Sequence, residues 1–291
     1  MGDESLIDKR LLRRSFEQAA ATYDSAAVLQ REVCRRVLDR LDYIKIEPRT
    51  ILDAGSGTGG ALSELARRYP RAHLVALDIA LAMLLRGRVP WWERLIRMGR
   101  RPCAVCGDIE YLPLADASAD MVWSNLALQW VNDLNRVFSG MWRVLAPGGL
   151  LMFSTFGPDT LKELRHAYRS ADAYTHVNRF VDMHDIGDIM VHSGFADPVM
   201  DMEYFTLSYT EVRELMRDLK AIGAHNVTRG RPIGLSGKTA FSSVVQNYEA
   251  FRRDGKLPAT FEIVYGHAWK PQRRRGPGGR PIIEIKPRPG D

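Results

Sequence analysis

The sequence has few cysteines and no long hydrophobic run. Three cysteines among 291 residues are too few for the disulfide framework of a small secreted protein. No segment reaches the roughly 18 consecutive apolar residues of a membrane-spanning helix, and the charged N-terminus lacks the apolar stretch of a secretory signal. We therefore expect a cytoplasmic protein that has no membrane partner.

Metal-ligand patterns are scarce as well. Cys103 and Cys106 have the spacing of a metal or redox pair, but no second pair accompanies them, so we expect them to serve ordinary packing. His184, His192 and His267 do not have metal-ligand spacing and are expected to be structural. The sequence therefore predicts no metal site.

The charge is mildly basic and unevenly distributed. There are 41 Lys and Arg against 35 Asp and Glu, a net charge of +6. Segments rich in basic residues attract acidic partners, such as nucleic acid or an acidic carrier protein, or they form solvated faces. The basic residues gather at Arg86, Arg88, Arg94, Arg97, Arg100 and Arg101, interleaved with Trp91 and Trp92, and at Lys270, Arg273, Arg274, Arg275 and Arg280.

The segment Ile51–Gly60 carries the clearest functional signal. An apolar pair leads into Asp53, and Gly55, Gly57 and Gly59 follow before an apolar helical pattern begins. This order predicts a buried strand, a glycine turn and a helix, the layout of a nucleotide-binding βα unit. Glycine tolerates positive φ and lets a ligand lie against the backbone. No lysine follows the glycines, which excludes a P-loop.

The next predicted strand ends in an acid. Residues 73–78 are apolar up to Asp78, which Ile79 follows. Asp78 comes about 20 residues after the glycines, where a carboxylate can accept hydrogen bonds from both hydroxyls of a ribose. The sequence therefore predicts a nucleoside at this edge of the sheet.

Polar groups also end the third and fourth predicted strands. Asp108 can accept a hydrogen bond from an adenine amine, and Ile109 can lie against the ring. Asn125 and Leu126 close the fourth strand, and a helix over 134–144 leads through Pro147-Gly-Gly149 into a fifth strand. These positions would surround one ligand at the same edge of the sheet.

The remaining pattern completes an α/β protein. We predict one domain over residues 1–270, with its core at about 45–205 and 259–270, and an irregular basic tail over 271–291. A strand over 199–207 and a last strand over 261–269 flank a helical segment at about 208–257. We interpret that segment as a cap over a substrate pocket.

The ordered motifs resemble those of the class I S-adenosylmethionine-dependent methyltransferases. The resemblance implies a doubly wound, Rossmann-like seven-stranded sheet with N-terminal helices, and S-adenosylmethionine as the cofactor. It also implies that Asp53, Gly55 and Gly57 shape the turn beneath the methionine arm of that cofactor. Asn125 and Leu126 would then border the methyl group.

Segments outside the core resemble a narrower family, the malonyl-acyl-carrier-protein O-methyltransferases of biotin synthesis. The resemblance runs from about Lys9 to about Trp269. It implies methylation of the free carboxylate of a malonyl thioester on acyl-carrier protein. We expect no nucleic-acid partner, and we expect a monomer. The segments are Ser15–Gln30, Asn125–Trp130, Ser154–Leu161, Phe180–Asp188 and Tyr265–Trp269.

The implied reaction asks for positioning rather than acid–base chemistry. A carboxylate is already ionised at neutral pH, so no general base is required. We predict that Tyr23 folds over the cofactor and bonds the substrate carboxylate, that Arg179 anchors it, and that Trp130 belongs to the core. Two departures from the family are Ser56, where cysteine is common, and the longer segment at 86–101.

Other functions fit the same motifs. One is methylation of a different small carboxylate or biosynthetic intermediate. A second is hydroxylation of an arginine during respiratory-complex assembly, which a related group resembling this chain performs. A third is a non-catalytic factor that binds a carrier or an assembly and retains the cofactor pocket for stability.

Overall fold

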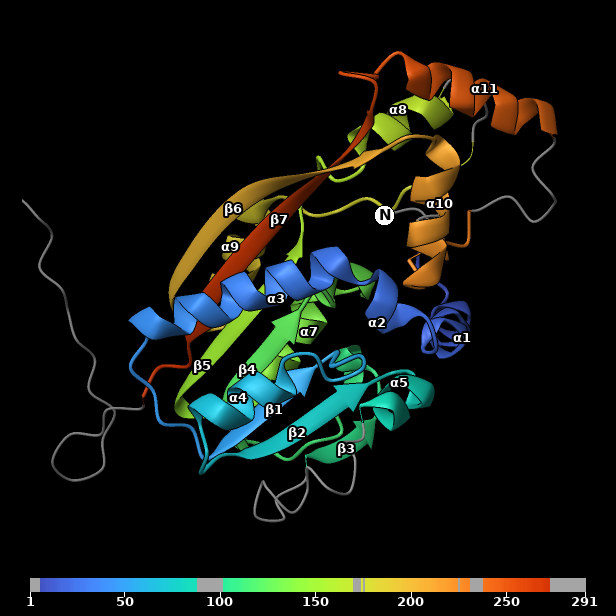
Figure 1. Cartoon of the computed structure of the whole chain (residues 1–291). Coiled ribbons are helices and arrows are strands. Elements are labelled where there is room, and N and C mark those ends of the chain that lie inside the picture. The colour runs from blue at the N-terminus through green and yellow to red at the C-terminus, as the bar shows by residue number, and fades with distance from the viewer. Residues whose placement is uncertain are drawn as a thin grey trace, which may run out of the picture.

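A twisted sheet of seven strands forms the centre of the molecule (Figure 1). The computed structural model describes residues 6–87, 102–169, 174, 176–224, 226–230 and 238–272. The strand order is β3-β2-β1-β4-β5-β7-β6. All neighbouring strands are parallel except at β7, which is antiparallel to β5 and β6. The strands are β1 (Thr50–Ala54), β2 (His73–Asp78), β3 (Cys103–Cys106), β4 (Ala119–Asn125), β5 (Leu145–Phe156), β6 (Ala196–Tyr209) and β7 (Leu257–Trp269).

Helices cover both faces of the sheet. Successive strand residues point to opposite faces, and the buried side chains divide accordingly: Ile51 and Met121 pack on one face, Leu52 and Val122 on the other. The first face is covered by α3 (Val28–Arg40) and α4 (Leu62–Arg68), together with α8 (Lys162–Arg169). The second face is covered by α7 (Leu134–Val144) and α9 (Met183–His192). The predicted doubly wound α/β fold is therefore confirmed.

The N-terminal helices pack against the segment between β6 and β7. That segment contains α10 (Val212–Ala221) and α11 (Lys238–Glu249), and the N-terminus contributes α1 (Lys9–Ala19) and α2 (Tyr23–Ala26). The backbone N–H of Asp8 donates to the carbonyl of Val227 at 2.9 Å, and that of Arg229 donates to the carbonyl of Leu6 at 2.9 Å. The two parts of the chain, more than 200 positions apart in the printed sequence, thus meet at one place.

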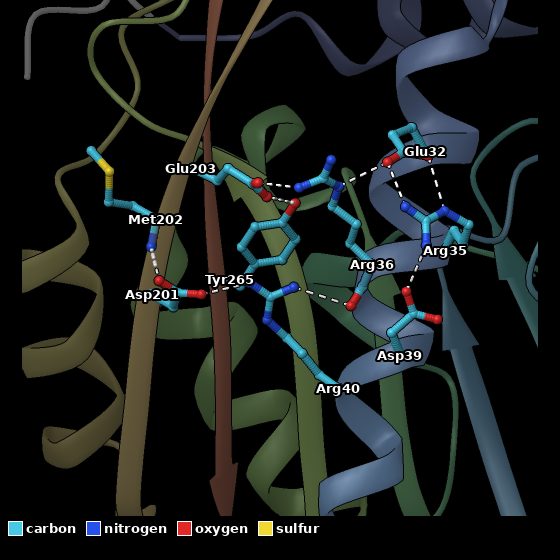
Figure 2. Close-up of polar contacts among 9 residues, drawn as sticks. All are labelled: Glu32, Arg35, Arg36, Asp39, Arg40, Asp201, Met202, Glu203 and Tyr265. Carbon is cyan, nitrogen blue, oxygen red and sulfur yellow. Dashed lines mark hydrogen bonds and ion pairs between the residues drawn. The ribbon is translucent and has the colours of Figure 1, made fainter.

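Ion pairs hold α3 across the β6–β7 edge of the sheet (Figure 2). Arg36 pairs with Glu203 of β6, and the Arg40 guanidinium donates to Asp201 at 2.5 Å. The Arg40 guanidinium also lies 3.7 Å from the centre of the Tyr265 ring of β7, a favourable cation–π contact. Side chains of the C-terminal half of α3 therefore fix the position of this helix.

Two predictions about the strands are wrong. The Pro147-Gly-Gly149 segment lies inside β5 rather than before it, because Leu145 already pairs with Ala119 and the register then shifts so that Leu150 pairs with Met121. Cys103 and Cys106 are exposed rather than packed, because β3 is the edge strand of the sheet. Within the described residues, no helix is long and apolar enough to cross a membrane.

Candidate active site

The glycine turn after β1 is folded tightly against neighbouring strand ends. Gly55 and Gly57 have φ of +81° and +54°, values that side-chain-bearing residues avoid. The N–H groups of Gly55 and Ser56 donate to the carbonyl of Leu77 at 2.8 and 2.9 Å. A Cβ on Gly55 would lie 2.3 Å from the Cβ of Ala127. The turn therefore requires glycine at position 55 for both conformation and space.

Asp78 holds the turn from the end of β2. Its Oδ2 accepts the N–H of Gly57 at 2.8 Å, and its Oδ1 accepts the N–H of Ala80 at 2.8 Å. Burial raises the pKa of this carboxyl, and the backbone N–H groups oppose that rise. Each oxygen keeps a further lone pair, so Asp78 can accept hydrogen bonds from two hydroxyls of a ligand.

Asp53 lies beneath the turn at the end of β1. Only 3% of it is exposed, and burial, reinforced by the charge of Asp78, raises its pKa to about 8. Asp53 is therefore mainly protonated at neutral pH. Its neighbour Asp78 is better able to carry charge, because it accepts hydrogen bonds from backbone N–H groups.

Asp108 lies two residues after the end of β3 and is tied to the N-terminal helix. It caps the short 3-10 helix η3 (Ile109–Tyr111), where its Oδ1 accepts the N–H of Glu110 at 3.0 Å. Lys9 of α1 donates to the same oxygen at 3.1 Å and also pairs with Glu110. Among the described residues Oδ2 has no hydrogen-bond donor, so it can accept an amine from a ligand.

A first cavity of about 750 Å³ opens over the turn and these strand ends. It brings together eight of the predicted site residues: Tyr23, Gly55, Gly57, Asp78, Ile79, Asp108, Ile109 and Leu126. Asp53, Gly59 and Asn125 do not line it. Gly59 packs against Leu62, and the Asn125 side chain is bonded to the carbonyl of Gln30 and to Ser154. Direct ligand contact by these three residues stays a prediction.

Tyr23 covers the glycine turn from the first position of α2. A Cβ on Gly57 would lie 3.9 Å from Cε1 of its ring. Burial, with the charges of Asp78 and Asp24, raises the pKa of the Tyr23 phenol well above its ordinary value. The hydroxyl therefore stays protonated and can donate a hydrogen bond into the first cavity.

A second, larger cavity of about 1480 Å³ adjoins the first. It extends from α3 toward α8 and α10, and most of its wall is apolar, including Leu164, Phe180 and Leu219. Six residues line both cavities and so form the wall between them: Gln30, Gln129, Trp130, Phe156, Ile222 and Ala224. A ligand in the first cavity could thus meet a second molecule entering from the other.

Two predicted positions differ from the structure. Trp130 is not in the core: it ends the 3-10 helix η4 (Leu128–Trp130), which turns the indole to line both cavities. Arg179 lines neither cavity; it lines a third one, to which Asp185 and Asp188 also contribute. Its neighbours Asn178 and Phe180 line the second cavity and Arg179 does not.

Sequence reasoning missed the side chains that α1 contributes. Lys9, Leu12 and Phe16 line the first cavity. Their spacing follows one face of a helix, which could have marked α1 as a covering helix but gave no information about what it covers. Most of the basic clusters, residues 88–101 and 273–291, lie outside the described residues. This part includes Arg88, Arg94, Arg97, Arg100, Arg101, Trp91, Trp92, Arg273, Arg274, Arg275 and Arg280.

Comparisons with known proteins agree with this arrangement. Residues 52–153 match a family model described as a methyltransferase domain. The malonyl-acyl-carrier-protein O-methyltransferase of Gallionella capsiferriformans is 58% identical, with 97% of this chain and 98% of that protein aligned. The enzyme of the same name from Nitrosospira multiformis is 60% identical over 93% of this chain and 92% of its own. Among solved structures, the YcgJ protein of Bacillus subtilis shares the fold with a TM-score of 0.57 at 14% identity, covering 82% of this chain and 99% of that protein.

Proposed function

Because this chain belongs to the malonyl-acyl-carrier-protein O-methyltransferase family, we propose that it methylates the free carboxylate of malonyl-acyl-carrier protein. The methyl donor is S-adenosylmethionine, and the product is the methyl ester that primes pimeloyl synthesis for biotin. The acyl-carrier protein is the macromolecular partner.

The first cavity suits S-adenosylmethionine. Asp78 and Asp108, at neighbouring strand ends, can accept from the ribose hydroxyls and the adenine amine, and Ile79 and Ile109 add apolar surface for the ring. Gly55 and Gly57 line this cavity without side chains, so the turn leaves its backbone open to the methionine arm. This set of donors, acceptors and apolar groups supports a nucleoside with a short amino-acid arm.

The residues of this chain do not need to move a proton in the reaction. When bound, the cofactor supplies an electrophilic methyl group on a positively charged sulfur. The acceptor carboxylate is ionised at neutral pH, so catalysis consists of holding it in line and excluding water. Phe156 and Ile222, in the wall between the cavities, supply apolar surface for that exclusion.

One observation carries the proposal: the cavity that suits the cofactor shares a wall with a larger apolar cavity. A malonyl group on a long flexible arm can enter the second cavity and reach the first. We also propose that α10 and α11, between β6 and β7, form the cap of the substrate cavity within a single domain over residues 1–270.

The test is transfer of labelled methyl from S-adenosylmethionine to malonyl-acyl-carrier protein. We expect base-labile label on the malonyl-carrier and none on acetyl-carrier protein, which lacks the free carboxylate. Asp78→Ala should weaken cofactor binding in calorimetry by about 1–3 kcal/mol and should lower transfer with it. Tight cofactor binding with no transfer to any malonyl thioester would refute the proposal and favour a non-catalytic factor.

A further inference from the structure

If the proposed function holds, the substrate carboxylate must be bound at the wall between the two cavities. This anion loses its charge as the methyl group arrives. A strong cation beside it would stabilise the reactant more than the transition state, and it would also repel the positively charged sulfur. Neutral N–H donors reduce the first cost and avoid the second, so we expect such donors in the wall.

Three of the six wall residues are polar: Gln30, Gln129 and Trp130. The Gln129 amide is already occupied, since its Nε2 donates to the carbonyl of Leu126 at 2.6 Å. Among the described residues, no acceptor bonds the Trp130 indole N–H or the side-chain amide of Gln30. These two donors are therefore unsatisfied at the one boundary that both ligands would share.

Neighbouring structure holds the Trp130 ring and the backbone of Gln30 in place. The Trp130 ring packs edge-on against Phe16 of α1, with ring centres 5.5 Å apart and planes at 87°. The main-chain carbonyl of Gln30 accepts from Asn125 Nδ2 at 3.2 Å, and Asn125 Oδ1 in turn accepts from Ser154 Oγ at 2.8 Å. The helix that carries Gln30 is itself fixed by the ion pairs of Figure 2. Donors carried by a packed ring and by a fixed helix need little rearrangement when the substrate binds.

We infer that the Gln30 amide and the Trp130 indole N–H bind the substrate carboxylate, in place of the predicted Arg179. Gln30 reaches the site from α3 and Trp130 from the loop after β4. One donor for each carboxylate oxygen would orient the anion toward the first cavity. The apolar second cavity would receive the rest of the acyl thioester.

The first test removes each donor with little change of shape. Trp130→Phe and Gln30→Met should each lower kcat/KM for malonyl-acyl-carrier protein by about tenfold to a hundredfold, because each loses a hydrogen bond to a charged group. The Kd of S-adenosylmethionine should stay at the wild-type value. Trp142→Phe, whose indole bonds Gly194 away from both cavities, and Gln246→Met, on the exposed side of α11, are the matched controls and should retain wild-type kcat/KM.

The second test uses charge. Gln30→Glu places an anion beside the substrate carboxylate, and each carboxylate raises the pKa of the other. Transfer by this variant should therefore be lowest at pH 8 and recover as the pH falls toward 6, whereas the wild-type protein shows no such recovery. A merely structural role for Gln30 would not produce this pH profile.

The outcomes separate the two proposals. Transfer by Trp130→Phe and Gln30→Met at wild-type kcat/KM would overturn the assignment of these residues and leave the proposed function intact. A parallel loss of cofactor binding in both variants would also overturn it, because the residues would then support the first cavity. No transfer by the wild-type protein would refute the proposed function and this assignment together.

Discussion

Alanine substitutions in the glycine turn should have graded costs that follow directly from the structure. Gly55→Ala forces a left-handed backbone on alanine, about 1–2 kcal/mol, and brings its Cβ to 2.3 Å from that of Ala127. Relief of such a contact in a packed region costs about a further 1–3 kcal/mol. We therefore expect Gly55→Ala to lower the free energy of unfolding by about 2–5 kcal/mol.

Two neighbouring glycines provide the comparison. Gly57 also has a positive φ, but a Cβ there would be 3.9 Å from Tyr23, an ordinary contact, so Gly57→Ala should cost only the strain of about 1–2 kcal/mol. Gly60 is exposed and has nothing within 4 Å of an added Cβ. Gly60→Ala should stay within about 0.5 kcal/mol of the wild type.

Urea unfolding followed by circular dichroism measures all three variants under one condition. The order of stability should be Gly60→Ala, then Gly57→Ala, then Gly55→Ala. Equal stability of Gly55→Ala and Gly60→Ala would refute the reasoning, because it would mean that neither the left-handed conformation nor the contact with Ala127 constrains the turn.

Three further predictions concern charged groups. Asp78→Asn turns an amide N–H₂ toward one of the two backbone N–H groups that Asp78 accepts; urea unfolding should show a loss of about 1–3 kcal/mol, and wild-type stability would contradict the bonding. The pKa of Asp53 is raised to about 8, so its protonated form stabilises the fold at low pH, and this contribution to the free energy of unfolding is lost as the pH rises from about 4 to 8. Asp53→Asn should remove this loss of stability. Parallel stability–pH curves for the variant and the wild type would contradict the raised pKa of Asp53. Lys9→Met breaks the ion pair with buried Glu110, so amide hydrogen exchange in α1 should accelerate. Arg13→Met, which breaks an exposed ion pair of the same helix, is the control. Equal exchange rates in the two variants would show that Lys9 does not anchor α1.

Local patterns gave the framework of the fold because they depend on neighbouring residues. The apolar run 73–78 with its terminal acid is β2, and the periodic segment 134–144 is α7, with the bounds that the sequence predicts. Asp78 ends β2 and lines the first cavity, where the carboxyl ends of the parallel strands meet. Side-chain alternation and helical periodicity are sufficient for statements of this kind.

The boundary between the two cavities could not be predicted in the same way, because its walls come from distant parts of the chain. Gln30, Trp130 and Ile222 meet at one boundary, and Lys9 reaches Asp108 across 99 positions. An isolated tryptophan in an apolar segment is equally compatible with the core or with a cavity wall. Arg179 had the right charge for an anion, but the direction of its side chain depends on tertiary packing that no local pattern encodes.

The location of the transferred methyl group tests the central claim most directly. Incubation of the wild-type protein with malonyl-acyl-carrier protein and ¹³C-methyl-labelled S-adenosylmethionine, followed by NMR of the product, distinguishes an ester oxygen from carbon, nitrogen or sulfur. A single labelled methyl ester on the terminal carboxylate is the predicted result. An unlabelled carrier, or label bonded to any atom other than that oxygen, would contradict the account.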